Sequence, residues 1–307
     1  MSTPSFEILH PRFARLSLHN VQLEKLHTGC RWAEGPAYFP AGRYLVWSDI
    51  PNDRVLRWDE TDGSVSVFMQ PSMNANGHTL DRQGRLISCE HRGRCVSRIE
   101  HNGNRTVLVD AFEGQPLNSP NDVVVKSDGS LWFTDPTYGI DSDYEGDAAP
   151  SAIGASNVYR FDPLTGELSA VITNMVRPNG LAFSPDERAL YVVDTGASHV
   201  PDGPRHVRRY TVQADGRSVS IGGPVLATAP VGLFDGLRVD VHGHLWLGAG
   251  DGVHCVGADG VHLGRIVVPE VVANVCFGGL KRNRLFICGT TSLYSIYLNT
   301  AGATWPA

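Results

Sequence analysis

Six oxygen-bearing residues recur along the chain in one local setting. Each stands 10 or 11 positions before a leucine that begins a short apolar run. Two of them are carboxylates, four are amides, and none is a base: Glu34, Asn76, Asn121, Asn179, Asp235 and Asn274. Carboxylate and amide oxygens gathered in one place would bind a hard cation or the hydroxyl groups of a sugar.

The apolar runs are typical of β-strands, since aliphatic and aromatic residues follow each leucine and turn-forming residues flank the run. The six leading residues recur at intervals of 39 to 58 positions. A third strand is expected in every copy and a fourth in five of them, which is the make-up of a propeller blade. The sequence therefore predicts an all-β fold, a six-bladed β-propeller of four-stranded blades.

The sixth copy has no room for a fourth strand before the end of the sequence. We expect residues 21–27, which have strand character, to supply that outer strand and so close the ring, removing open sheet edges. The predicted organisation is an N-terminal extension over residues 1–20, one propeller domain over 21–300 and a C-terminal tail over 301–307.

The inner strand of each blade lines the channel of a propeller, so the six leading residues should form a ring at one mouth. Buried carboxylates without a base require a cation. Oxygen ligands favour Ca²⁺, Mg²⁺ or Mn²⁺, and mixed, flexible ligation favours Ca²⁺ among them, with Zn²⁺ a further candidate. Asn-Gly and Asp-Gly pairs are also turn signals, and the shared register favours the ring over six separate turns.

Further residues are candidates for contacts to a substrate. Asn76 and Asn121 could hydrogen-bond sugar hydroxyls. His78 lies two positions after Asn76 on the same expected strand, so it either contacts the substrate or only lines the channel.

The second strands end on acidic residues that should return to the same mouth. Asp49 and Asp194 are expected to accept backbone hydrogen bonds. Asp135 precedes a long insertion, residues 137–156, which is expected to cover the site, and both Asp135 and Tyr138 are candidate substrate contacts.

Several motifs, as a set, resemble the gluconolactonase family, the regucalcin-like (senescence-marker-protein) group of six-bladed propellers. The likeness extends over about residues 21 to 298 and rests on Glu34-Gly-Pro36, Ser119-Pro-Asn-Asp122, Trp132-Phe-Thr-Asp-Pro136, Arg177-Pro-Asn-Gly-Leu-Ala-Phe-Ser-Pro-Asp186 and Phe234-Asp-Gly236.

The resemblance implies a Ca²⁺-type metal held by Glu34, Asn179 and Asp235. It implies that Asn121 is a further ligand or a substrate contact, and that Asp235 is the catalytic acid/base. Regucalcins have Arg where this chain has Ser119, and this difference points to the bacterial gluconolactonase branch.

Lactone hydrolysis by this set would use the metal to polarise the carbonyl and Asp235 to take a proton from water. Two alternatives stay open: organophosphate or aryl-ester hydrolysis at the same site, and a propeller that binds calcium or a partner without catalysis. The intact polar ring favours an enzyme acting on a small-molecule lactone. Which lactone, which metal and which oligomeric state apply stays open.

Composition bounds the location and the partners. The 307 residues carry a formal net charge of −6 without a single-sign block, which argues against nucleic acid or a membrane surface as a partner. The sequence shows neither a signal-like segment nor an apolar membrane span, so a cytoplasmic protein is expected. The six cysteines are expected to be reduced, with a Cys89–Cys95 bridge as an alternative.

Overall fold

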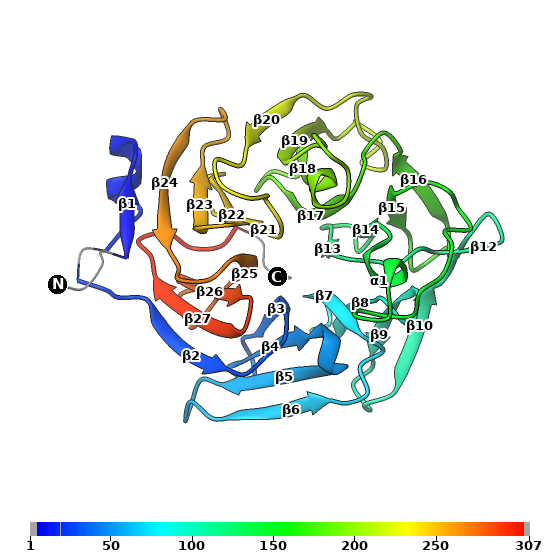
Figure 1. The fold of residues 1–307 in the computed structure, drawn as a ribbon, viewed down its shortest axis with the longest axis horizontal. Helices are drawn as coiled ribbons and strands as arrows, with labels where there is room; N and C mark the ends of the chain where they lie inside the picture. The colour runs from blue at the N-terminus through cyan, green and yellow to red at the C-terminus, as the bar shows by residue number, and fades with distance from the viewer. Residues whose placement is uncertain (1–4, 19, 304–307) are drawn as a thin grey trace.

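The computed structural model describes residues 5–18 and 20–303 and shows β-sheets arranged in a ring around a central channel (Figure 1). In this part of the chain, six sheets each contain four antiparallel strands in order from the channel outward, and one of them has a fifth. This is a six-bladed β-propeller, so the predicted fold class is confirmed.

Blades 1 to 3 are each built from four consecutive strands. Blade 1 contains β3 (Ala33–Phe39), β4 (Tyr44–Asp49), β5 (Arg54–Asp59) and β6 (Val65–Met69). Blade 2 contains β7 (Ala75–Leu80), β8 (Leu86–Glu90), β9 (Cys95–Ile99) and β10 (Arg105–Val109). Blade 3 contains β13 (Val123–Val125), β14 (Leu131–Asp135), β15 (Asn157–Phe161) and β16 (Leu168–Ile172).

Blades 5 and 6 differ from blade 4 because strands from the N-terminal part of the chain join them. Blade 4 contains β17 (Pro178–Phe183), β18 (Ala189–Asp194), β19 (His206–Thr211) and β20 (Val225–Thr228). Blade 5 contains β21 (Leu237–Val239), β22 (Leu245–Ala249), β23 (Gly252–Val256), β24 (His262–Val267) and β1 (Phe6–Ile8). Blade 6 contains β25 (Val272–Gly278), β26 (Arg284–Gly289), β27 (Ser292–Tyr297) and β2 (Glu24–Thr28).

The ring closes through β2, which pairs antiparallel with β27, Thr28 opposite Ser292. The prediction that residues 21–27 complete the last blade is therefore confirmed, with the strand shifted by a few residues. Closure joins the first and last parts of the chain in one sheet and covers the outer edge of β27.

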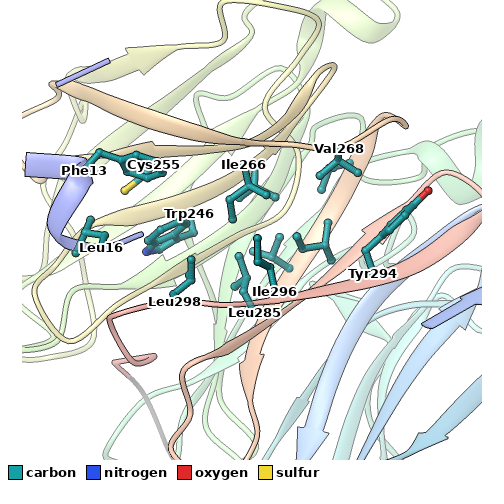
Figure 2. Close-up of a cluster of buried hydrophobic side chains, with 14 of the residues drawn as sticks. Phe13, Leu16, Trp246, Cys255, Ile266, Val268, Leu285, Tyr294, Ile296 and Leu298 are labelled. Atoms are coloured by element: carbon teal, nitrogen blue, oxygen red, sulfur yellow. The ribbon is translucent and has the colours of Figure 1, made fainter. Parts of the chain in front are cut away.

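The described part of the N-terminal extension packs on the propeller. β1 pairs with β24, and the 3₁₀ turn η1 (Pro11–Arg15) brings Phe13 and Leu16 against Trp246 (Figure 2). Of the predicted terminal segments, residues 1–4, 19 and 304–307 lie outside the described residues.

The second strand of each blade is buried along almost its whole length. It lies between two strands of its own sheet and under the faces of the adjacent blades, which explains its continuous apolar sequence. Trp47, Trp132 and Trp246 on these strands have no exposed surface. Each large buried side chain contributes about 1.5–3 kcal/mol to stability, so the scaffold around the channel is rigidly packed.

Two glycines that follow ring residues allow adjacent inner strands to approach closely. A Cβ atom on Gly77 would lie 2.5 Å from the Asn121 carbonyl oxygen, and one on Gly180 would lie 2.5 Å from the Asp235 carbonyl oxygen. These Asn-Gly pairs lie within β7 and β17. They therefore mark close packing around the channel, and the interpretation as turns does not apply to them.

The remaining elements are short and lie in connections. They are η2 (Ile50–Asn52), the β11 (Ala111–Phe112) and β12 (Gln115–Pro116) hairpin, α1 (Tyr138–Asp141) in the long insertion, and η3 (Gly196–Ser198). All six cysteines are buried and free, so Cys89 and Cys95 are not bridged. Across the described residues, no helix has the length and apolar character needed to cross a bilayer.

Candidate active site

One mouth of the channel opens into a cavity of about 410 Å³. Five of the six ring residues line it: Glu34, Asn76, Asn121, Asn179 and Asp235. The sixth, Asn274, lies behind Glu34 and donates an amide hydrogen bond to its Oε2 at 3.0 Å. The structure therefore brings together the residues that the repeat placed in one ring.

Irregular backbone aims these side chains into the cavity. The pairing of β3 with β4 shifts register between Glu34 and Ala37, and the pairing of β17 with β18 shifts between Pro178 and Leu181. Asn121 and Asp235 lie just before their strands begin. A β-bulge redirects a side chain that regular alternation would fix, which suits a ring of ligands.

Three aspartates at the ends of second strands fix the backbone that leads into the ring. Asp49 accepts the Arg31 N–H at 2.8 Å, and Asp194 accepts the Arg177 N–H at 2.9 Å. The expectation for these two residues is confirmed. Asp135 does the same, with the N–H groups of Asn118 and Ser119 at 2.9 and 2.8 Å.

Asp135 therefore does not line the cavity, and the structure does not support it as a substrate contact. Its carboxylate is fully buried and already bonded to backbone. The insertion that follows it, not Asp135 itself, reaches the cavity.

His78 is also outside the cavity. Its ring lies between the Ser48 and Ser88 hydroxyls, each at 2.8 Å, and it lines a separate space of about 90 Å³ that Arg238 also lines. The β7–β8 register shift between Ala75 and His78 breaks the two-residue alternation, so Asn76 and His78 do not share a site. Of the two readings of His78, the structure favours channel lining.

The two carboxylates of the ring, Glu34 and Asp235, repel each other across the cavity. Burial raises the pKa of Glu34, and burial followed by the charge of Glu34 raises the pKa of Asp235. A hydrogen bond from Asn179 to Asp235 opposes this shift in pKa only in part. A cation between them would remove the repulsion.

The donor set fits a hard divalent cation. The ring residues offer the cavity two carboxylates and three amides, and the Asn76 Oδ1 atom is buried without a hydrogen-bond partner. In the described part of the chain, no three His, Cys, Asp or Glu side chains gather as a metal cluster. Glu34, Asn121, Asn179 and Asp235 could thus hold a metal only as a mixed carboxylate and amide site.

Tyr138 lines the cavity, as predicted, from the start of the insertion. Its hydroxyl lies 2.6 Å from Thr195 Oγ1, and Asn179 Nδ2 donates to the same Thr195 oxygen at 3.3 Å. The Tyr138 ring lies under the Arg177 guanidinium at 4.9 Å. These contacts connect the insertion of blade 3 to blade 4 directly beside Asn179.

A second connection runs from the ring to the insertion. Asn76 Nδ2 lies 3.2 Å from His91 Nε2, and His91 Nδ1 lies 3.7 Å from a Glu145 carboxylate oxygen. Burial lowers the pKa of His91 to about 4, so the ring is neutral at pH 7 and its Nε2 can accept from Asn76. This bond fixes the orientation of the Asn76 side chain and leaves its Oδ1 atom without a hydrogen-bond partner.

Beneath the ring lies an ion pair. The Arg238 guanidinium lies 3.1 Å from Asp122 Oδ2 and donates to the Leu237 carbonyl oxygen at 2.7 Å. Asp122 follows the ring residue Asn121 directly, and Arg238 comes three positions after Asp235. In the layer below the cavity, the charge of Asp122 is therefore neutralised by the Arg238 side chain.

Comparison with known proteins agrees with this geometry. The SMP-30/gluconolactonase/LRE-like region matches residues 32–291, which include every ring residue. This chain belongs to that family. Family relatives include a gluconolactonase from Zymomonas mobilis, 28% identical over 95% of this chain and 85% of the relative. A pentonolactonase from Haloferax volcanii is 31% identical over 90% of this chain and 83% of its own.

Solved structures show the same family fold. A gluconolactonase from Xanthomonas campestris superposes with a TM-score of 0.89 at 37% identity, covering 96% of this chain and 94% of that one. The calcium-binding protein regucalcin from Agrobacterium tumefaciens gives 0.75 at 20% identity, covering 91% and 95%, and shows the fold alone.

Four residues of this family member's site had not been identified from the sequence: His91, Glu145, Thr195 and Arg238. Thr195 directly follows Asp194, and His91 directly follows Glu90, so each stands one position after the end of a second strand. The position directly after a second strand could therefore have identified His91 and Thr195 as site residues from the sequence. Glu145 lies in an insertion of irregular backbone, where sequence spacing carries no register.

Proposed function

We propose that this protein hydrolyses a sugar lactone to the aldonic acid, with one divalent metal ion in the cavity and Asp235 as the general base. The activity class follows from the family, whose members include the gluconolactonase and the pentonolactonase named above. The observation that carries the proposal is the pair of carboxylates, Glu34 and Asp235, that line one cavity together with amide side chains.

Glu34, Asn179 and Asp235 would hold the metal, with Asn121 beside them as a fourth ligand. Ca²⁺ suits this mixed and adaptable set of oxygens best, and Mg²⁺, Mn²⁺ and Zn²⁺ are the alternatives. When bound, the cation supplies Lewis acidity at the lactone carbonyl and stabilises the negative charge that develops there.

The protein's own groups orient the substrate and move the proton. Asp235 takes a proton from a water molecule as the water oxygen bonds to the carbonyl carbon. Asn179 orients the Asp235 carboxylate by a hydrogen bond. Asn76, Asn121 and Tyr138 line the cavity where sugar hydroxyls would lie. The carbonyl–ring oxygen bond then breaks and gives the open hydroxy acid.

The test is proton release from glucono-1,5-lactone, with the spontaneous rate subtracted. Protein stripped by chelator is assayed alone and after addition of Ca²⁺, Mg²⁺, Mn²⁺ or Zn²⁺. We expect negligible activity without metal and restored activity with at least one ion. Folded protein that stays inactive on lactones with every ion, and hydrolyses aryl esters or organophosphates instead, would replace the lactone with those substrates.

A further inference from the structure

Glu145 brings a third carboxylate to the cavity from the insertion over the mouth. It lines the same space as Glu34 and Asp235, whose pKa values are raised mainly by burial and further by the charge of Glu145. Only 22% of its side chain is exposed. A carboxylate placed here faces whatever occupies the cavity.

The other acids of the insertion are each held by a partner. Asp141 pairs with Arg177 at 2.6 Å, and Asp147 pairs with Arg92 at 3.2 Å. Asp143 accepts the Ala148 N–H at 2.8 Å. These three carboxylates have structural roles that need no ligand.

Glu145 has no such partner among residues 5–18 and 20–303. His91 Nδ1 lies 3.7 Å from its carboxylate, and no described N–H or O–H group donates a hydrogen bond to that carboxylate. The His91 ring is neutral, so it cannot form an ion pair with Glu145 at pH 7. An almost buried acid without a donor is costly if ionised, and this cost favours the protonated form.

The charged groups around Glu145 also favour its protonated form. Asp141 lies in the same insertion, Glu34 and Asp235 lie across the cavity, and His91 is uncharged. Burial, followed by the charge of Asp141, raises the pKa of Glu145 to about 7. The side chain can therefore carry a proton near neutral pH.

We propose that Glu145 is the general acid that protonates the departing ring oxygen of the lactone. The inference rests on the proposed lactone hydrolysis. Lactone opening needs such a group, because an alkoxide is a poor leaving group and Asp235 takes up a proton at the other end of the reaction.

The step balances as follows. Water oxygen bonds to the carbonyl carbon and its proton passes to Asp235. The bond between the carbonyl carbon and the ring oxygen breaks, and the electron pair stays on the ring oxygen. The Glu145 proton bonds to that oxygen and forms the hydroxyl group of the product. Asp235 then loses its proton and Glu145 regains one through solvent, which returns both groups to their starting states.

The experiment compares two lactones that differ in their leaving group, in wild type and Glu145→Gln. Glucono-1,5-lactone releases an alkoxide, whereas dihydrocoumarin releases a phenolate, which needs no acid because phenol ionises near pH 10. We expect kcat on glucono-1,5-lactone to fall about 100- to 1,000-fold. On dihydrocoumarin we expect a fall of less than about fivefold, since protonation contributes little there.

A pH profile on glucono-1,5-lactone gives a second, independent readout. The wild type should lose kcat on the alkaline side as Glu145 ionises, and Glu145→Gln should lack that limb. Asp143→Asn, in the same insertion, is the matched control and should keep both the rate and the limb.

Three results would count against Glu145 as the acid: an equal loss on both lactones, no loss on either, or an alkaline limb that persists in Glu145→Gln. A wild type that hydrolyses neither lactone would instead overturn the proposed function itself, so the two failures are distinguishable.

Discussion

Two successive layers of the channel differ in how their charges are balanced. In the ring layer, Glu34 and Asp235 face one cavity, and burial together with mutual repulsion raises the pKa of Asp235. In the layer below, Asp122 is paired with Arg238 at 3.1 Å. The same sixfold repeat supplies the backbone of both layers.

The difference shows which layer is built for function. A paired, hydrogen-bonded layer gains nothing from a ligand. A layer with unbalanced carboxylates and an unpartnered amide oxygen, Asn76 Oδ1, is stabilised when a cation arrives. Substitutions in the two layers should therefore have opposite effects on stability and activity.

Asp235→Asn should give the largest effect on activity. We expect kcat for lactone hydrolysis to fall about 100- to 10,000-fold, because the amide cannot take a proton from water. In chelator, the same variant should unfold at an equal or higher temperature than the wild type, since one of two repelling carboxylates is gone. Calorimetry that shows clear destabilisation of the metal-free variant would contradict the repulsion.

Arg238→Met should give the largest effect on stability. It leaves Asp122 buried and unpaired, and we expect the free energy of unfolding to fall by about 3–5 kcal/mol. Urea unfolding measures the change. The double variant Asp122→Asn/Arg238→Met should recover much of the loss, and additive losses in that double variant would show that the pair is not coupled.

His78 should make the lower part of the channel sensitive to acid. Burial lowers the pKa of His78 to about 3, whereas an unfolded histidine titrates near 6.5. Between these values only the unfolded chain binds the proton, so stability falls as the pH drops below 6.5. From pH 7 to 5, this histidine accounts for a loss of about 2 kcal/mol. In His78→Gln the fall in urea-unfolding free energy between those pH values should be smaller by that amount; an unchanged difference would refute the assignment.

Asp194→Asn should have the smallest effect, a modest loss of activity. Comparing it with a substitution at the opposite end of blade 4 shows whether the loss is specific to the end at the site. Asp194 holds the Arg177 N–H ahead of Asn179, so we expect kcat/KM to fall about fivefold from a hydrogen-bond loss of about 1 kcal/mol. Asp186→Asn is the control, because Asp186 accepts the Arg188 N–H at 3.1 Å in an exposed turn. Equal effects of the two substitutions on kcat/KM would exclude a positioning role for Asp194.

The ring could be predicted from the sequence because its residues recur at a nearly constant distance from the strand that follows them. Glu34 and Asp235 each precede a leucine at nearly the same distance, and that distance is set by one hairpin of one blade. The closing strand was predictable for a similar reason, because the sixth copy is one strand short. Both depend on short-range spacing.

The Asp122–Arg238 layer and the position of the insertion, residues 137–156, depend on contacts that sequence spacing does not record. Asp122 and Arg238 meet across the channel from blades 3 and 5, 116 positions apart in sequence. His78 leaves the site because of a bulge. Glu145 reaches the cavity along a loop, where residue spacing fixes no direction.

Calorimetric titration of Ca²⁺ into chelator-stripped protein tests the central contrast most directly. The wild type should bind one ion per chain in the ring layer. Asp235→Asn should bind at least about tenfold more weakly, since it loses one of two carboxylate ligands. Asp122→Asn/Arg238→Met should keep the stoichiometry of one. A wild type that binds none of Ca²⁺, Mg²⁺, Mn²⁺ and Zn²⁺, or an Asp235→Asn variant that binds as tightly as the wild type, would contradict the account.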